Sequence, residues 1–295
     1  MNDKIILKSD RLEVDVLRDG TRYRGSRYDW SGIIEQVRLD GRHTFCSEER
    51  YNGEYGGMKG IGLCGVFEWT DTHLYDSIPA FDSFPLLGVG LLRKPDNGAF
   101  IFNKPHVVEP FTRETEYGEN WIRIHTLPRL CCGIAVDQIK TITVEGRTVT
   151  ISQTLKNVGE VNIDAVEFNH NFIKFDEEPI CSDYWTTLPY APAITLRRGE
   201  LTLTTSGYKP QRFDETSGSL AFRIRGCETL RTHWMKTENC KTGTSMLVED
   251  EFPVSCMYCF TNPDTFSTET YKQISLEPGA EMSYTRRYTF SSAEK

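Results

Sequence analysis

The sequence lacks the apolar and basic runs that direct a protein to a membrane or to nucleic acid. Its N-terminus, MNDKIILKSDRLEVDVL, has only three consecutive apolar residues, Ile5 to Leu7, so neither a signal peptide nor a transmembrane helix is expected there. The formal net charge is −8, and acidic and basic residues are interspersed without a basic stripe. We therefore expect a cytoplasmic protein that contacts neither membranes nor nucleic acids.

Sequence motifs for common cofactors and nucleophiles are also missing. No G-x-S-x-G, G-x-x-x-x-G-K or G-x-G-x-x-G occurs in the chain. The nine cysteines are an odd number and no export signal precedes them, which indicates reduced thiols. Cys256 and Cys259 form one C-x-x-C pair without a second, which favours buried thiols over a zinc or redox site. We expect no cofactor and no metal.

Helical periodicity is scarce, whereas alternation with period two is found throughout the 295 residues. Residues 141–155 predict a hairpin with its turn at Glu145-Gly146, and the same rhythm recurs around turns at Arg198-Gly199 and Pro278-Gly279. No linker interrupts the pattern. It predicts one all-β domain over residues 1–295, a sandwich or barrel, whose irregular part at 45–110 is a place where a site tends to lie.

The first candidate site is RYRGSRYDWSG, residues 22–32. Arg24, Arg27 and Asp29 are interleaved there with aromatic residues. Guanidinium groups grip hydroxyls or carboxylates and aromatic faces stack on sugar rings, so the segment suits a carbohydrate or an acidic small molecule. The alternative is an ordered hairpin whose Arg–Asp pairs are structural.

The second candidate is GVFEWTDTHLYDS, which contains Glu68, Asp71 and His73. On a strand Asp71 and His73 would share a face, as an oriented base or a metal pair does, but no third ligand is evident. His106 follows a proline in extended chain and is a further candidate for a cleft. For either histidine, the alternative is an ordinary surface or hydrogen-bonded residue.

The third candidate is AVEFNHNFIKFDEEP, residues 165–179. Alternation places Phe168, His170 and Phe172 on one face of a strand and Glu167, Asn169 and Asn171 on the other. Asp176 and Trp185 follow within twenty residues and add an acidic and an aromatic group. The alternative is a core histidine, with the two asparagines facing water.

The same region resembles the central segment of galactose mutarotases (aldose 1-epimerases). In that family a strand ending in N-x-G precedes a strand with N-H-x-Y-F-N, and here the motif reads Asn169-His170-Asn171-Phe172. The ending NPDTFSTETYKQISLEPGAEMSYTRRYTF resembles the family's Pro-Asp element, its L-x-P-G-E-x-Y strand and its final T-x-Y-x-F. The match extends over about residues 140–290, and the N-terminal third matches loosely. The resemblance implies a β-supersandwich of two large packed antiparallel sheets.

The resemblance also implies a reaction and some of its residues. Family members open and reclose a hexose ring with a histidine as acid, which corresponds to His170, and a carboxylate as base. The position that matches the family's base is Tyr258, a poor base at neutral pH because an ordinary tyrosine has a pKa of about 10. Either another carboxylate, Glu68 or Glu167, then acts as base, or the chain is a divergent branch of the family with altered chemistry. The family's second histidine has no clear match, and His73 and His106 are candidates to replace it.

Together these features predict a mutarotase-like enzyme that acts on a monosaccharide. Arg24 or Arg27 would grip the sugar, and Trp69 or Trp185 would stack on it. One alternative is a non-catalytic sugar-binding protein, which the tyrosine at 258 supports. Another is a lyase-type sugar enzyme that uses Asn169, His170, Tyr258 and Arg27. The identity of the sugar, its charge and the oligomeric state stay open at this point.

Overall fold

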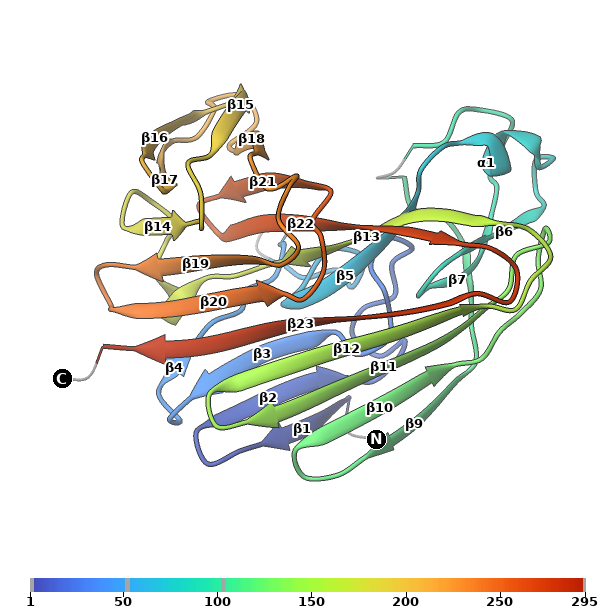
Figure 1. Ribbon diagram of the computed structural model, residues 1–295, viewed down its shortest axis with the longest axis horizontal. Coiled ribbons are helices and arrows are strands. Elements are labelled where there is room, and N and C mark those ends of the chain that lie inside the picture. The colour runs from blue at the N-terminus through green and yellow to red at the C-terminus, as the bar shows by residue number, and fades with distance from the viewer. Residues whose placement is uncertain (1–2, 51–53, 102–103, 294–295) are drawn as a thin grey trace.

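The computed structural model describes residues 3–50, 54–101 and 104–293, and within them strands dominate (Figure 1). Two large antiparallel sheets pack face to face, and a small third sheet flanks them. This arrangement confirms the predicted all-β sandwich of two large sheets.

The first sheet contains ten strands among the described residues. In spatial order they are β1 (Lys4–Lys8), β2 (Leu12–Leu17), β3 (Ile34–Leu39), β5 (Leu63–Trp69), β13 (Ile163–Asn171), β22 (Thr265–Leu276), β21 (Cys256–Asn262), β18 (Leu220–Arg225) and β15 (Ala193–Arg198), with β4 (His43–Thr44) beside β3.

The second sheet also has ten strands in the described part of the chain. Their order is β16 (Glu200–Thr204), β17 (Gly207–Arg212), β14 (Tyr184–Thr187), β19 (His233–Asn239), β20 (Thr244–Asp250), β23 (Glu281–Ser292), β12 (Thr148–Asn157), β11 (Val136–Glu145), β10 (Trp121–Thr126) and β9 (Arg113–Tyr117). The third sheet consists of β6 (Ser83–Leu86), β7 (Gly90–Arg93) and β8 (Val108–Pro110), and the short helical segments are α1 (His73–Ser77) and η1 (Phe175–Glu177).

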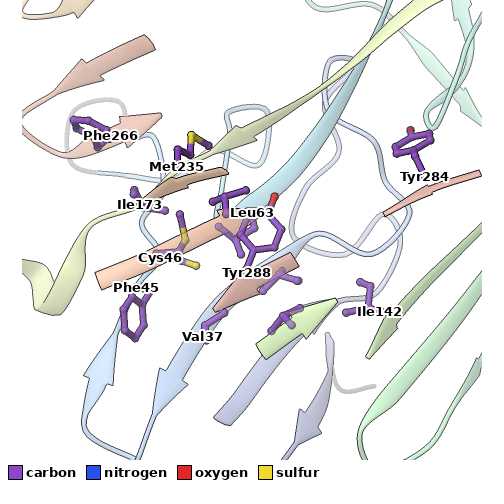
Figure 2. Close-up of a cluster of buried hydrophobic side chains, with 14 of the residues drawn as sticks. Val37, Phe45, Cys46, Leu63, Ile142, Ile173, Met235, Phe266, Tyr284 and Tyr288 are labelled. Carbon is purple, nitrogen blue, oxygen red and sulfur yellow. The ribbon is translucent and has the colours of Figure 1, made fainter. Parts of the chain in front are cut away.

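A large apolar core fills the space between the two big sheets (Figure 2). Val37 and Leu63 of the first sheet and Ile142 and Tyr288 of the second are buried in it. Burying one large apolar side chain stabilises the fold by about 1.5–3 kcal/mol. The inward-facing residues of the alternating strands therefore supply the main driving force for folding.

The predicted hairpin at 141–155 is present as β11 and β12. Glu145 pairs with Thr148, which places the turn at Gly146 and Arg147, one residue later than predicted. Gly146 has a φ of +54°, a left-handed conformation that glycine adopts without a steric penalty.

The two other predicted turns lie where expected but join strands of different sheets. After Arg198 the chain leaves β15, which pairs with β18, and enters β16, which pairs with β17 in the second sheet. Likewise, β22 belongs to the first sheet and β23 to the second. A turn signal therefore marks where the chain reverses, without saying which sheet receives the next strand.

Segments outside the two large sheets cover the outer face of the first sheet, which is the face turned away from the second sheet. A second apolar cluster forms there, in which Tyr28 and Trp30 of the β2–β3 connection and Phe84 of β6 pack with Phe168 and Phe172 of β13. Both faces of β13 are consequently buried. No helix in the described ranges is long and apolar enough to cross a membrane.

Candidate functional site

A cleft of about 830 Å³ lies on the outer face of the first sheet. Its floor is formed by side chains of β5, β13, β22 and β21, and β15 supplies one wall. In Figure 1, β15 and β18 rise at one end of strands β22 and β13, and the segment around α1 rises at the other.

Strand pairing sets polar side chains in a row across the outer face of the first sheet, and most of this row lies on the floor of the cleft. Phe168 of β13 pairs with Tyr271 of β22, so two positions further along His170 lies opposite Glu269. Glu269 pairs in turn with Tyr258 of β21, and Tyr258 pairs with Arg223 of β18. Because side chains of paired residues point to the same face, these groups are neighbours although they come from four strands.

His170 and Glu269 form the central contact of the row. His170 Nε2 lies 3.3 Å from Glu269 Oε1, and both side chains are almost fully buried. The Tyr271 hydroxyl donates a hydrogen bond of 2.8 Å to Glu269 Oε2, and Ser267 Oγ lies 3.3 Å from His170 Nδ1. Each member of the pair thus has a second partner that fixes its orientation.

Burial gives this pair unusual protonation. Loss of solvent raises the pKa of Glu269 to about 8, against a weaker opposing effect of the Tyr271 hydrogen bond. Burial lowers the pKa of His170 well below its ordinary value, and the nearby Arg27 charge lowers it further. At neutral pH the carboxyl group is therefore protonated and the imidazole is neutral, so the pair holds one proton donor and one acceptor.

Aromatic rings hold the histidine and line the floor beside it. Phe172 stacks on the His170 ring at 4.4 Å between centroids, and Tyr28 meets it edge-on at 5.6 Å. Phe168 and Tyr271 stack on each other at 4.3 Å in the next row and also line the cleft. Such flat apolar faces beside hydrogen-bonding groups suit a sugar ring.

Several of the sequence-predicted residues meet in the cleft. His170, Glu68, Tyr258 and Arg27 all line it. Burial raises the pKa of the Glu68 carboxyl. Burial also raises the pKa of Tyr258, which keeps its phenol protonated at neutral pH, so we assign no role as base to this residue.

Two further predicted residues, Trp69 and His106, line a smaller, mainly apolar pocket of about 160 Å³ that shares Arg27 and Glu68 with the cleft. Trp69 Nε1 donates a hydrogen bond to the Pro85 carbonyl, and burial lowers the pKa of His106. These residues therefore lie beside the cleft rather than within it.

The opposite face of β13 is buried between the sheets, so the candidate substrate-binding residues Asn169 and Asn171 do not line the cleft. The alternative, that these asparagines face water, is wrong as well. Asn169 Oδ1 accepts hydrogen bonds of 2.7 Å from the backbone N–H and the hydroxyl of Thr270. Asn171 Oδ1 accepts one from the Tyr288 hydroxyl. Alternation along β13 points both asparagines toward the second sheet, and the packing of the two sheets buries them.

Glu167 shares that inward face and pairs with Arg286 of the second sheet, Oε1 to Nη1 at 3.2 Å. Asp29 is also fully buried and binds Lys140 and the Ser31 hydroxyl. Both carboxylates hold structural ion pairs and neither lines the cleft, so we leave them out of the site that we propose.

The remaining predicted residues lie outside the cleft lining. Arg24 and His73 are exposed, the latter at the start of α1. Asp176 accepts a hydrogen bond from the Thr44 backbone N–H and contacts His43, and Trp185 belongs to β14 of the second sheet.

Glu269 is the site residue that reasoning from the sequence missed. The sequence contains a signal for it, the turn Asn-Pro-Asp-Thr at 262–265, which joins β21 and β22 into a hairpin. Counting across that turn pairs Tyr258 with Glu269, which puts a carboxylate next to the position where the sequence has a tyrosine. Arg197 and Arg198 were missed as well.

Solved structures of galactose mutarotase-like proteins share this fold. A galactose mutarotase-like protein from Clostridium acetobutylicum aligns with a TM-score of 0.60 at 9% identity, over 98% of this chain and 95% of its own. A galactose mutarotase related enzyme from Lactobacillus acidophilus aligns at 0.56 and 11% identity, over 98% and 97% of the two chains. An aldose epimerase homologue from C. elegans aligns at 0.55 and 11%, over 99% of both.

No family model matches the sequence, and no curated protein sequence matches it either. At sequence identities near 10% these structures share the fold alone, and the function depends on the side chains in the cleft.

Proposed function

We propose that this protein is an isomerase similar to aldose 1-epimerases, which interconverts the anomers of a monosaccharide bound in the cleft. The observation that carries the proposal is the buried contact of 3.3 Å between His170 Nε2 and Glu269 Oε1 on the floor of the cleft. The raised pKa of Glu269 and the lowered pKa of His170, both due to burial, support it. The fold shared with galactose mutarotase-like proteins supports it.

Anomer exchange needs one proton removed from the anomeric hydroxyl and one delivered to the ring oxygen. Both oxygens are bonded to the same carbon, so two catalytic groups in direct contact can address them from one side of the ring. His170 Nε2 takes the hydroxyl proton while protonated Glu269 gives its proton to the ring oxygen, and the C1–O5 bond breaks.

The open-chain sugar then rotates about its C1–C2 bond and exposes the other face of the carbonyl. In ring closure the imidazolium returns its proton to the carbonyl oxygen and the Glu269 carboxylate takes the proton back. The pair ends as it began, so no cofactor is consumed. This assignment reverses the roles that the family resemblance implies for the histidine and the carboxylate.

Two neighbouring hydroxyls position the pair. Tyr271 donates to Glu269 and stabilises the carboxylate that forms when the ring opens. Ser267 lies beside His170 Nδ1, which leaves Nε2 directed at Glu269 and the cleft.

The test follows anomer exchange by NMR for a panel of hexoses, pentoses, deoxy sugars, uronates and sugar phosphates. We expect the wild-type protein to accelerate exchange of at least one sugar. His170→Ala and Glu269→Gln should each reduce that rate by about 10²-fold or more, the contribution of a positioned general acid or base. Glu116→Gln, which changes an exposed carboxylate of β9 in the second sheet, is the matched control and should leave the rate unchanged.

Saturable binding of a sugar without any acceleration would overturn the proposal and favour the non-catalytic sugar-binding protein. The tyrosine at position 258 supports that alternative less than it did from sequence, because Glu269 supplies a carboxylate on the adjacent strand.

A further inference from the structure

Two consecutive arginines of β15, Arg197 and Arg198, both line the cleft. Adjacent residues of a regular strand point to opposite faces of the sheet. Here the register between β15 and β18 shifts between Leu196 and Arg198, so one extra residue is inserted into β15. A β-bulge of this kind re-aims a side chain, and such bulges are common beside active sites.

The two guanidinium groups are held above aromatic rings of the floor. Arg197 lies 5.3 Å from the centre of the Tyr258 ring, and Arg198 lies 6.0 Å from the centre of the Phe260 ring. Neither arginine forms a salt bridge within the part of the chain that the structure describes, although the charge of Arg198 acts on the nearby Asp214 carboxylate. Both guanidinium groups therefore keep hydrogen-bond donors for a ligand.

These charges lie close to the reacting pair. Tyr258, beneath Arg197, is the direct strand partner of Glu269, and neighbouring strands are about 4.8 Å apart. A sugar whose anomeric carbon contacts Glu269 and His170 would lie over Tyr258 and extend an exocyclic group toward Arg197 and Arg198.

Charged residues also line the rest of the cleft, with both signs present. The acidic ones are Glu49, Glu68 and Glu269 and the further basic ones are Arg27, Lys59 and Lys104, whereas β15 contributes two cations and no acid. A ligand that places an anionic group at β15 gains charge-assisted hydrogen bonds there, and a neutral sugar does not.

We propose that Arg197 and Arg198 form a subsite for an anionic oxygen group, a phosphate or a carboxylate, carried by the sugar that the His170–Glu269 pair converts. The inference rests on the proposed function and adds its substrate class, an acidic aldose. The bulge in β15 is the structural device that creates the subsite, because without it only Arg197 would face the ligand.

The experiment measures affinity by calorimetry or NMR titration, separately from turnover. The probes are glucose, glucose 6-phosphate and glucuronate, with inorganic phosphate as competitor. We expect one of the two anionic sugars to bind about tenfold or more tightly than glucose, and this preference to shrink as salt is raised. Which of the two it is distinguishes phosphate from carboxylate.

The double variant Arg197→Gln/Arg198→Gln should lose the preference for the anionic sugar while glucose affinity changes less than about twofold. The matched control, Arg42→Gln/Arg147→Gln, removes the same charge from two turns outside the cleft and should keep the preference. Because Arg197 and Arg198 are exposed, the double variant is expected to fold, and Arg197→Lys/Arg198→Lys should restore part of the affinity.

Equal affinity for neutral and anionic sugars, or an equal loss in the two double variants, would overturn the subsite. Anion preference that depends on the arginines but comes without anomer exchange would support the subsite and contradict the proposed isomerase. Faster anomer exchange of neutral sugars, without tighter binding of anionic sugars, would support the proposed isomerase and contradict the subsite.

Discussion

In the proposed mechanism, the proton on Glu269 decides which member of the His170–Glu269 pair acts as the acid. Burial raises the pKa of Glu269 to about 8, so raising the pH through that value removes the proton that the ring oxygen must receive. We expect kcat/KM for anomer exchange to be flat near pH 7 and to fall by about tenfold per pH unit well above pH 8. A pH–rate profile of the wild-type protein measures this.

The profile of Glu269→Gln, run as a control, should lack the alkaline limb because glutamine does not titrate in this range. A wild-type rate that instead rises from pH 6 to pH 9 would contradict the assignment. That outcome would restore the roles that the family resemblance implies, with the carboxylate as base.

Among strands and turns, the sequence alone predicted periodicity well and pairing poorly. The alternation in β13 correctly placed His170 apart from Glu167 and the asparagines, because a period of two depends only on the local chain. Which strands become neighbours depends on the packing of distant segments. Burial of Asn169 and the change of sheet after Arg198 therefore could not be read from the residues around them.

The crossing from β15 to β16 gives a prediction about Gly199, which follows the two arginines. Gly199 has a φ of +78°, and a Cβ there would lie 2.8 Å from the Arg212 carbonyl oxygen and 3.0 Å from Leu220 Cα. We expect Gly199→Ala to lower the free energy of unfolding by about 2–4 kcal/mol, since left-handed strain and a backbone clash add. Urea denaturation measures the change.

Gly146→Ala is the matched comparison for this turn. Gly146 has a φ of +54°, but no atom lies within 4 Å of the added Cβ, so only left-handed strain of about 1–2 kcal/mol is expected. If Gly199→Ala lowers the free energy of unfolding by no more than Gly146→Ala does, the backbone around β15 relaxes to accept the added methyl group. In that case the bulge that aims Arg197 and Arg198 would not be held by this crossing.

At the scale of the whole molecule, one buried arginine connects the two large sheets. Arg286 of β23 contacts Asp250 of the second sheet at 2.6 Å from Nε to Oδ1, and Glu167 of the first sheet at 3.2 Å. All three side chains are shielded from solvent. Such a group adds little net stability while intact, but removing the cation takes from two buried carboxylates their nearest ionic partner in a low-dielectric interior.

We therefore expect Arg286→Met to lower the free energy of unfolding by about 3–5 kcal/mol. The adjacent residue offers a control, because Arg287 pairs with Glu251 at the surface, and Arg287→Met should cost less than about 1 kcal/mol. Since Arg286 links both sheets, urea unfolding of the wild type should follow one transition by fluorescence and circular dichroism, as a single domain over residues 1–295 requires. Two transitions would mean that the sheets unfold independently. Equal losses of unfolding free energy in the two variants would mean that the buried ion-pair cluster of Arg286 does not couple the sheets.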